Sequence, residues 1–146
     1  MADALSKLIF EEHLAEAKAA DDAGRWKIEC PADLEVRVTL SPTEHHEAFV
    51  ARLVWIEYPG CEPPSVKFID PATGRLDVPQ AWPVARGFRP TNFDICATWT
   101  REGFQIHPEW KNDRRYIWIS HGNLVLKSLH RLQEELDDSY QGRFKS

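Results

Sequence analysis

The residues best suited to covalent chemistry surround Cys96, in the tract Asn92-Phe93-Asp94-Ile95-Cys96-Ala97-Thr98-Trp99. A cysteine thiolate can attack a carbonyl carbon, hold the acyl group as a thioester and release it to an amine. Cys96 belongs to no alternating pattern of the kind that would bury it, so the tract predicts a loop with an accessible thiol. The alternative is a small buried apolar side chain, which is a common role of a free cysteine.

Three side chains near Cys96 in the sequence could assist this chemistry. The amide of Asn92 could donate to the oxyanion formed during amine attack, although asparagine also favours turns. Asp94 could orient the amine, but a carboxylate so close would raise the pKa of the thiol. His107 could accept the proton of the amine or lower the pKa of the thiol, or it could simply anchor its loop. Cys96, Asn92, Asp94 and His107 form the candidate catalytic set.

The other cysteines are expected to be structural. Cys30 ends an alternating run with Trp26 and Ile28, which predicts a place in the core. Cys61 lies in a proline-rich corner and is expected to pack there. An odd total of three cysteines, without a secretory signal at the start, predicts free thiols in the cytoplasm.

A zinc site is a weaker alternative. It would need the scattered ligands Cys61, Cys96, His107 and His121, because the chain contains no Cys-x-x-Cys motif. We therefore expect no metal and no organic cofactor.

Composition limits the partners. The chain has 146 residues, 42% of them apolar and 28% charged, which is typical of one globular domain with a real core. Its formal charge of −5 gives no general attraction to nucleic acid or anionic lipid, and is compatible with a basic protein partner. No run approaches the ~18 apolar residues of a membrane span, so a membrane partner is not expected.

A rigid corner precedes the cysteine tract. In Tyr58-Pro59-Gly60-Cys61-Glu62-Pro63-Pro64, each proline fixes its own φ and lacks a backbone donor. Each proline also pushes the preceding residue toward extended geometry. The corner therefore predicts an extended connection between two strands.

The elements that carry this corner are predicted from periodicity. Apolar residues at three- and four-residue intervals predict a helix over residues 3–20, ended near Gly24. Alternation and turn residues predict a four-stranded antiparallel meander with strands at residues 26–30, 34–41, 49–56 and 66–69. The strand from Phe49 to Ile56 is expected to be central.

The rest of the chain is predicted as a long loop and a helix. Residues 70–120 form a long irregular loop, with no convincing regular element over 70–95 and an ordered aromatic layer over 96–120. An exposed Trp82 or Trp99 would suit a partner anchor. An apolar stripe predicts a helix over 123–138, and residues 141–146 are expected to fray. The prediction is a single α+β domain over residues 1–146.

This order resembles the ubiquitin-conjugating-enzyme (UBC) fold, from the first helix to the last. The motifs that carry the likeness are Tyr58-Pro59 with Pro63-Pro64, and Asp94-Ile95-Cys96, which looks like the step that holds the thioester. The chain looks most like divergent bacterial members, some of them encoded in CBASS antiphage operons. The resemblance implies that Cys96 accepts the C-terminus of a ubiquitin-like protein, or of a cGAS-like nucleotidyltransferase, with the help of an activating enzyme.

The sequence also departs from that family. Three residues separate Tyr58-Pro59 from Pro63-Pro64, one more than is usual in the conjugating enzymes and typical of the non-catalytic RWD domains. The His-Pro-Asn triplet before the cysteine is absent, although Arg89-Pro90-Thr91-Asn92 lies nearby. The usual pair of C-terminal helices is missing. The alternative function is therefore an inactive RWD-type interaction module.

Overall fold

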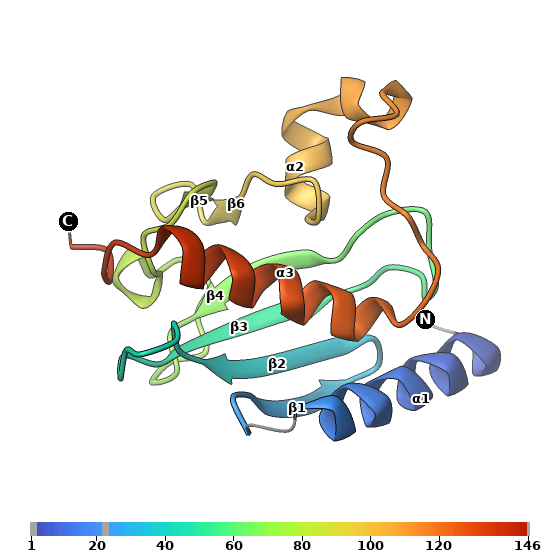
Figure 1. Ribbon diagram of the computed structural model, residues 1–146, viewed down its shortest axis with the longest axis horizontal. Helices are drawn as coiled ribbons and strands as arrows, with labels where there is room; N and C mark the ends of the chain where they lie inside the picture. The colour runs from blue at the N-terminus through green and yellow to red at the C-terminus, as the bar shows by residue number, and fades with distance from the viewer. Residues whose placement is uncertain (1–2, 22–23, 146) are drawn as a thin grey trace.

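The computed structural model describes residues 3–21 and 24–145. It confirms an α+β domain with an N-terminal helix, a four-stranded antiparallel sheet and a C-terminal helix (Figure 1). The elements are α1 (Ala4–Ala20), β1 (Lys27–Ala32), β2 (Glu35–Leu40), β3 (Phe49–Val54), β4 (Ser65–Ile69), η1 (Pro79–Ala81), β5 (Phe88–Arg89), β6 (Asp94–Ile95), α2 (Arg101–Ile106), η2 (Pro108–Asn112) and α3 (Leu124–Ser139). No helix in these two described ranges is long and apolar enough to cross a membrane.

Both long helices begin at side-chain caps. The Asp3 carboxylate accepts from the Ser6 amide at 2.7 Å at the start of α1. The Asn123 side chain accepts from the Leu126 amide at 3.0 Å at the start of α3. These contacts satisfy amides that have no partner within the helix. The amide group of Asn123 also donates to the His13 carbonyl at 2.8 Å, which joins the start of α3 to α1.

The sheet has the order β1-β2-β3-β4, with every neighbouring pair antiparallel, and β3 is central as predicted. The register places Val38 opposite Ala51, and Ala51 opposite Phe68, all of them fully buried. Alternation in the strands therefore gives one buried face. The opposite face carries Arg52 and Lys67, which are also register partners.

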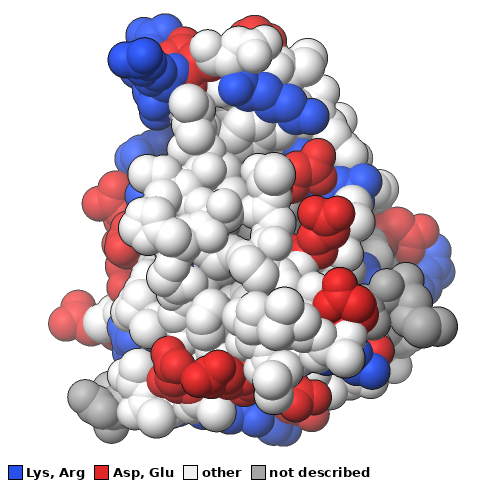
Figure 2. Space-filling view, turned by 90° about the vertical axis from the view of Figure 1, so that its right-hand side faces the viewer, with Lys and Arg blue, Asp and Glu red and all other residues white. Residues whose placement is uncertain are grey.

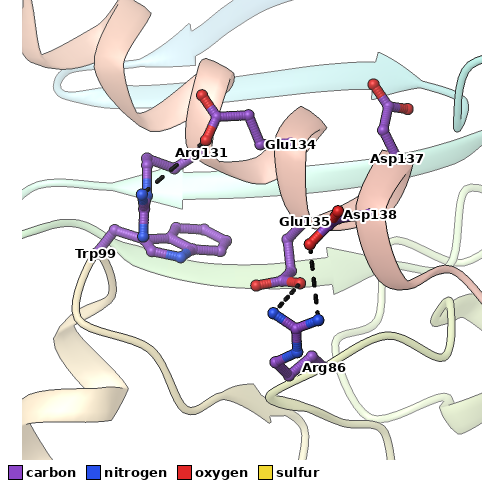
Figure 3. A pocket seen from close by; sticks show the side chains of 7 residues that line it. All are labelled: Arg86, Trp99, Arg131, Glu134, Glu135, Asp137 and Asp138. Atoms are coloured by element: carbon purple, nitrogen blue, oxygen red, sulfur yellow. Dashed lines mark ion pairs between the residues drawn. The ribbon is translucent and has the colours of Figure 1, made fainter.

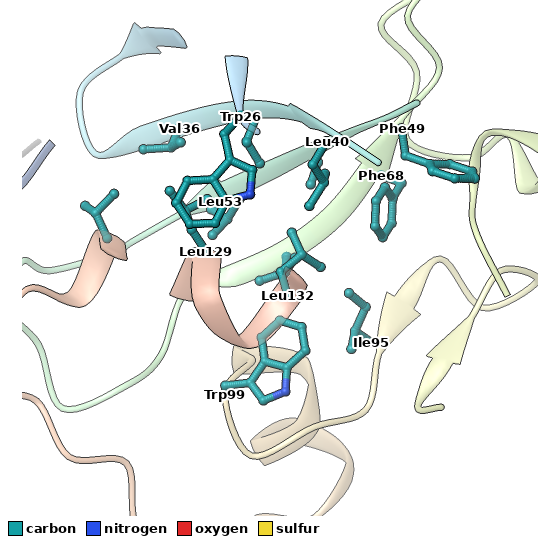
Figure 4. Packing of buried hydrophobic residues seen from close by; sticks show 14 of the residues in the cluster. Trp26, Val36, Leu40, Phe49, Leu53, Phe68, Ile95, Trp99, Leu129 and Leu132 are labelled. Carbon is teal, nitrogen blue, oxygen red and sulfur yellow. The ribbon is translucent and has the colours of Figure 1, made fainter. Parts of the chain in front are cut away.

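Helix α3 packs on the buried face of the sheet. Its predicted stripe is fully buried: Val125, Leu129, Leu132 and Leu136. Figure 4 shows Leu129 and Leu132 between the strands on one side and Ile95 with Trp99 on the other. Ile95 and Trp99 flank Cys96 in sequence, so the core reaches from the sheet to the cysteine tract.

Cys30 does not lie in the core, and that prediction was wrong. The thiol is exposed. The pairing of Glu29 with Arg37 and of Ala32 with Glu35 leaves one extra residue in β1, which is a β-bulge. Because β1 is also an edge strand, the alternation that buries Trp26 does not continue to Cys30.

Residues 70–120 contain more regular structure than predicted. The prediction of no regular element over 70–95 was wrong, because η1 and the hairpin of β5 and β6 lie there. Helix α2 and η2 lie in the part predicted as an irregular layer. These elements are two to six residues long, too short to give a periodic signal. Trp82 and Trp99 are buried, so neither is an exposed anchor.

The C-terminal residues are paired, and the prediction of fraying was wrong for the described residues up to 145. The Val84 amide donates to the Gly142 carbonyl at 2.8 Å, and the Gln141 amide donates to the Val84 carbonyl at 2.8 Å. The Phe144 amide donates to the Trp82 carbonyl at 2.9 Å. This polar segment has no periodic pattern from which its order could be predicted. It is ordered by backbone hydrogen bonds to residues 82–84, which are distant in the sequence.

Candidate functional site

The β5–β6 hairpin leads directly into Cys96. Arg89 and Asp94 are opposite each other in the hairpin, and their side chains form two hydrogen bonds of 2.7 and 2.8 Å. The Lys67 ammonium of β4 donates to the carbonyl of Phe93 in the turn at 2.6 Å. This bond and the contact of Phe88 with Phe68 of β4 hold the hairpin beside β4, immediately before Cys96.

The backbone at Cys96 is held from two sides. The Cys96 amide donates to the Gly87 carbonyl at 2.8 Å. A Cβ on Gly87, which has a φ of +83°, would lie 2.7 Å from the Cys96 carbonyl oxygen. On the other side, a Cβ on Gly103 of α2 would lie 2.0 Å from the Ala97 carbonyl oxygen. Both glycines permit an approach that any side chain would block.

Helix α2 ties this segment to the proline corner. Its cap, Thr100, accepts from the Gly103 amide at 3.0 Å and donates to the Ile95 carbonyl at 2.6 Å. The Arg101 amide donates to the Pro64 carbonyl at 2.8 Å. The corner and the cysteine tract, 32 residues apart in the sequence from Pro64 to Cys96, are therefore neighbours in the fold.

A buried carboxylate strengthens the same junction. Glu102 of α2 accepts from the Val66 amide at 3.1 Å and from the Ser65 hydroxyl. Both donors belong to β4, at the exit of the corner. Helix α2 is thus positioned by the sheet at its first turn.

The Cys96 thiol is half-buried, and its surroundings do not activate it. Burial raises the pKa of the thiol; Arg89 opposes this, and the Asp94 carboxylate adds to it. The rise caused by Asp94 is in the direction expected from the sequence. Because its pKa is raised, the Cys96 thiol is mainly protonated at neutral pH. The reactive form is the thiolate, so this state of the thiol is not activated.

Asn92 and His107 lie in different places. Asn92 is an exposed residue of the turn between β5 and β6, and its backbone N–H donates to the Arg89 carbonyl at 2.9 Å. His107 caps the C-terminal end of α2, where its ring stacks on Trp110 at 4.4 Å and its Nδ1 lies 3.2 Å from Glu109. The fold therefore groups Cys96 with Asp94 and gives His107 other partners.

Cys61 is exposed, so the expectation that it packs in the corner was wrong. The corner is buried through Tyr58, Gly60, Pro63 and Pro64, which leaves the Cys61 side chain on the outer side. Among the described residues, no three His, Cys, Asp or Glu side chains come together in a way that could hold a metal ion. The scattered zinc ligands considered from the sequence are therefore not assembled.

The sequence did not single out the residues that fix Cys96. Arg89, Gly87, Gly103 and Thr100 each act through a contact at the cysteine tract. Arg89 and Asp94 bracket a tight turn with opposite charges, which is the one pattern that could have indicated a hairpin pair. The two glycines gave no such signal, because glycine is required at each position by the close approach of another backbone segment.

Two hollows lie beside the cysteine tract and share Trp99 and Arg131 as walls. The first has a volume of about 520 Å³ and is rich in acidic side chains of α3 (Figure 3). In it, the Arg86 guanidinium lies 3.9 Å from Glu135 and 3.6 Å from Asp138. The second, of about 300 Å³, is lined by aromatic and basic side chains. The surroundings of Cys96 thus offer surfaces of both charges.

Comparisons of the chain with protein-family models, with curated proteins and with solved structures found no match.

Proposed function

We propose that this chain is a ubiquitin-conjugating-type acyl carrier in which Cys96 holds the acyl group as a thioester. One observation carries the proposal: a half-exposed cysteine sits on a backbone that is pinned at both sides and joined to the proline corner through α2. The buried side chains of Ile95 and Trp99 anchor the tract on each side of the thiol. Such a segment can carry a large acyl group without losing its position.

The proposed reaction is two successive acyl transfers. The Cys96 sulfur attacks the carbonyl carbon of a donor thioester, a new C–S bond forms, and the donor thiolate leaves. An amine nitrogen then attacks the same carbon, the bond to Cys96 breaks, and the amine proton passes to solvent or a base. No oxidant, reductant or metal takes part.

The donor that we propose is the tail of another protein. Through the resemblance to bacterial conjugating enzymes of antiphage operons, the candidates are a ubiquitin-like protein and a cGAS-like nucleotidyltransferase. An activating enzyme would supply the first thioester. Because the thiol has a raised pKa, we also propose that the bound partner helps to generate the thiolate.

The test is transfer to purified protein with the candidate donor, its activating enzyme and ATP. Wild type should form an adduct on a gel without reductant, and reductant should remove it. Cys96→Ser should give an ester that resists reductant, and Cys96→Ala should give no adduct. Cys61→Ala is the matched control, because Cys61 is exposed and lies in the neighbouring corner. A reducible adduct on Cys96→Ala would exclude Cys96 as the carrier.

An inactive interaction module of the RWD type is the second candidate. Two observations favour it: the three-residue spacing of the proline corner and the raised pKa of the Cys96 thiol. This reading predicts slow labelling of Cys96 by a thiol reagent in the native state and fast labelling in denaturant. Labelling of the native protein within a few-fold of the denatured rate supports the carrier instead.

A further inference from the structure

The proposed acyl transfer gives no role to the side chains that line the basic hollow beside the cysteine tract. It has a volume of about 300 Å³ and lies between residues 115–119 and the first half of α3. Thr98 and Trp99 form the wall nearest Cys96. Arg115, Lys127 and Arg131 also line it, whereas none of the described lining residues has a carboxylate.

Lys127 has the least compensating negative charge of the three, because Arg115 is paired with Asp113 at 2.8 Å and Arg131 also lines the acidic hollow. The Lys127 ammonium donates to the Ile119 carbonyl at 2.8 Å and, among the described residues, forms no ion pair. The nearest carboxylate of Arg131, that of Glu134, lies 4.0 Å away. Burial and the charge of Arg131 lower the pKa of Lys127. An anion between the two side chains would relieve their repulsion.

The aromatic side chains of the hollow hold the cations in place. The Lys127 ammonium lies 4.3 Å from the centre of the Trp118 ring, and the Arg115 guanidinium lies 5.2 Å from that of Tyr116. Cations held over aromatic rings lose less freedom when they bind a ligand.

The size of the hollow points to a small ligand. Its volume of about 300 Å³ lies at the lower end of the range for small-molecule sites, roughly 300–1,000 Å³. Figure 2 shows the side of the molecule that lies at the right in Figure 1; Lys and Arg side chains lie at its upper end, with Asp and Glu side chains beside them.

We propose that this hollow binds a small molecule through a phosphate group whose oxygens accept from Lys127 and Arg131. Phosphate matches this site because arginine and lysine donate charge-assisted hydrogen bonds to its several oxygens. The ligand would contact Thr98 and Trp99, and so would lie against the wall that continues from Cys96. Binding at this site does not require Cys96 to be a carrier.

The experiment is calorimetric titration of the full chain with inorganic pyrophosphate and with phenyl phosphate at low salt. We expect saturable binding that Lys127→Met and Arg131→Met each weaken at least tenfold. Lys18→Met is the matched control, because Lys18 lies on α1 and lines no part of the hollow. The change to methionine keeps most of the apolar stem of lysine, so packing on Trp118 is preserved.

Three results would overturn the proposal. Wild type could show no saturable binding to either probe, or the Lys127 and Arg131 variants could bind as wild type does. A glutamate-rich peptide could also bind more tightly than pyrophosphate and lose affinity in the same variants, which would assign the hollow to an acidic protein segment. Thermal unfolding of each variant shows whether it is folded. If one of the two variants does not fold, the other still tests the proposal.

Discussion

Gly103 of α2 lies against the backbone of Ala97, so that a Cβ at position 103 would be 2.0 Å from the Ala97 carbonyl oxygen. The same Gly103 amide is capped by Thr100 at 3.0 Å. Helix α2 therefore closes over the residue next to Cys96 through a position where a side chain has no room.

Gly103→Ala should destabilise the protein by about 2 kcal/mol, as expected for overpacking. In an open helix, the same change would stabilise by about 1 kcal/mol, because alanine has the higher helix propensity. Urea unfolding measures the difference. Gln105→Ala, at an exposed position of the same helix, is the control for the helix propensity of alanine. A Gly103→Ala protein as stable as wild type would contradict the close approach.

The Arg89–Asp94 pair should control the titration of Cys96. Asp94→Asn removes a charge that raises the pKa of the thiol and leaves Arg89 unpaired, so the pKa should fall. Arg89→Gln should raise it further. Native labelling rates from pH 6 to 10, with Cys30 and Cys61 changed to serine, report Cys96 alone.

The labelling experiment has a matched control in the exposed pair of Arg75 and Asp77, which forms the same two contacts at 2.8 Å. Asp77→Asn should leave the Cys96 titration unchanged. In wild type, the rate should rise with pH through a midpoint above the ordinary thiol value of about 8.5. A midpoint below that value, or no response to Asp94→Asn, would show that these neighbours do not set the thiol pKa.

Gln133 should be important for stability although it is polar. It is buried, accepts from the Trp26 indole at 2.9 Å and donates to the Ser41 carbonyl at 2.9 Å. Gln133→Ala leaves both groups without a partner and should cost about 2 kcal/mol. Exposed Gln105 provides the control, since Gln105→Ala should change the unfolding free energy by less than about 0.5 kcal/mol. Equal effects at both positions would rule out this role.

The C-terminal segment should protect the backbone of Val84 from exchange. Removal of residues 141–146 deletes the acceptor of the Val84 amide and two further hydrogen bonds to residues 82–84. Native-state hydrogen exchange should show faster exchange at Val84, and unfolding should become easier by about 2 kcal/mol. Removal of Ser146 alone is the control. Unchanged protection after the longer deletion would show that the segment does not hold Val84.

Much of the fold could be predicted from the sequence because its signals are local. Helical spacing and end residues located α1 and α3 to within a residue or two, and alternation with turn residues located the four strands. These features depend on residues that lie only a few positions apart in the chain.

Tertiary structure alone decided how the candidate site is arranged. The exposure of Cys30 depends on a bulge in β1, and the backbone at Cys96 is fixed by close contacts at Gly87 and Gly103. Likewise, the C-terminal segment is hydrogen-bonded to residues 82–84, and the His107 ring stacks on Trp110. The sequence by itself determined which groups are present and which elements carry them. Their distances, burial and charges came from contacts between residues far apart in the chain, which no local pattern encodes.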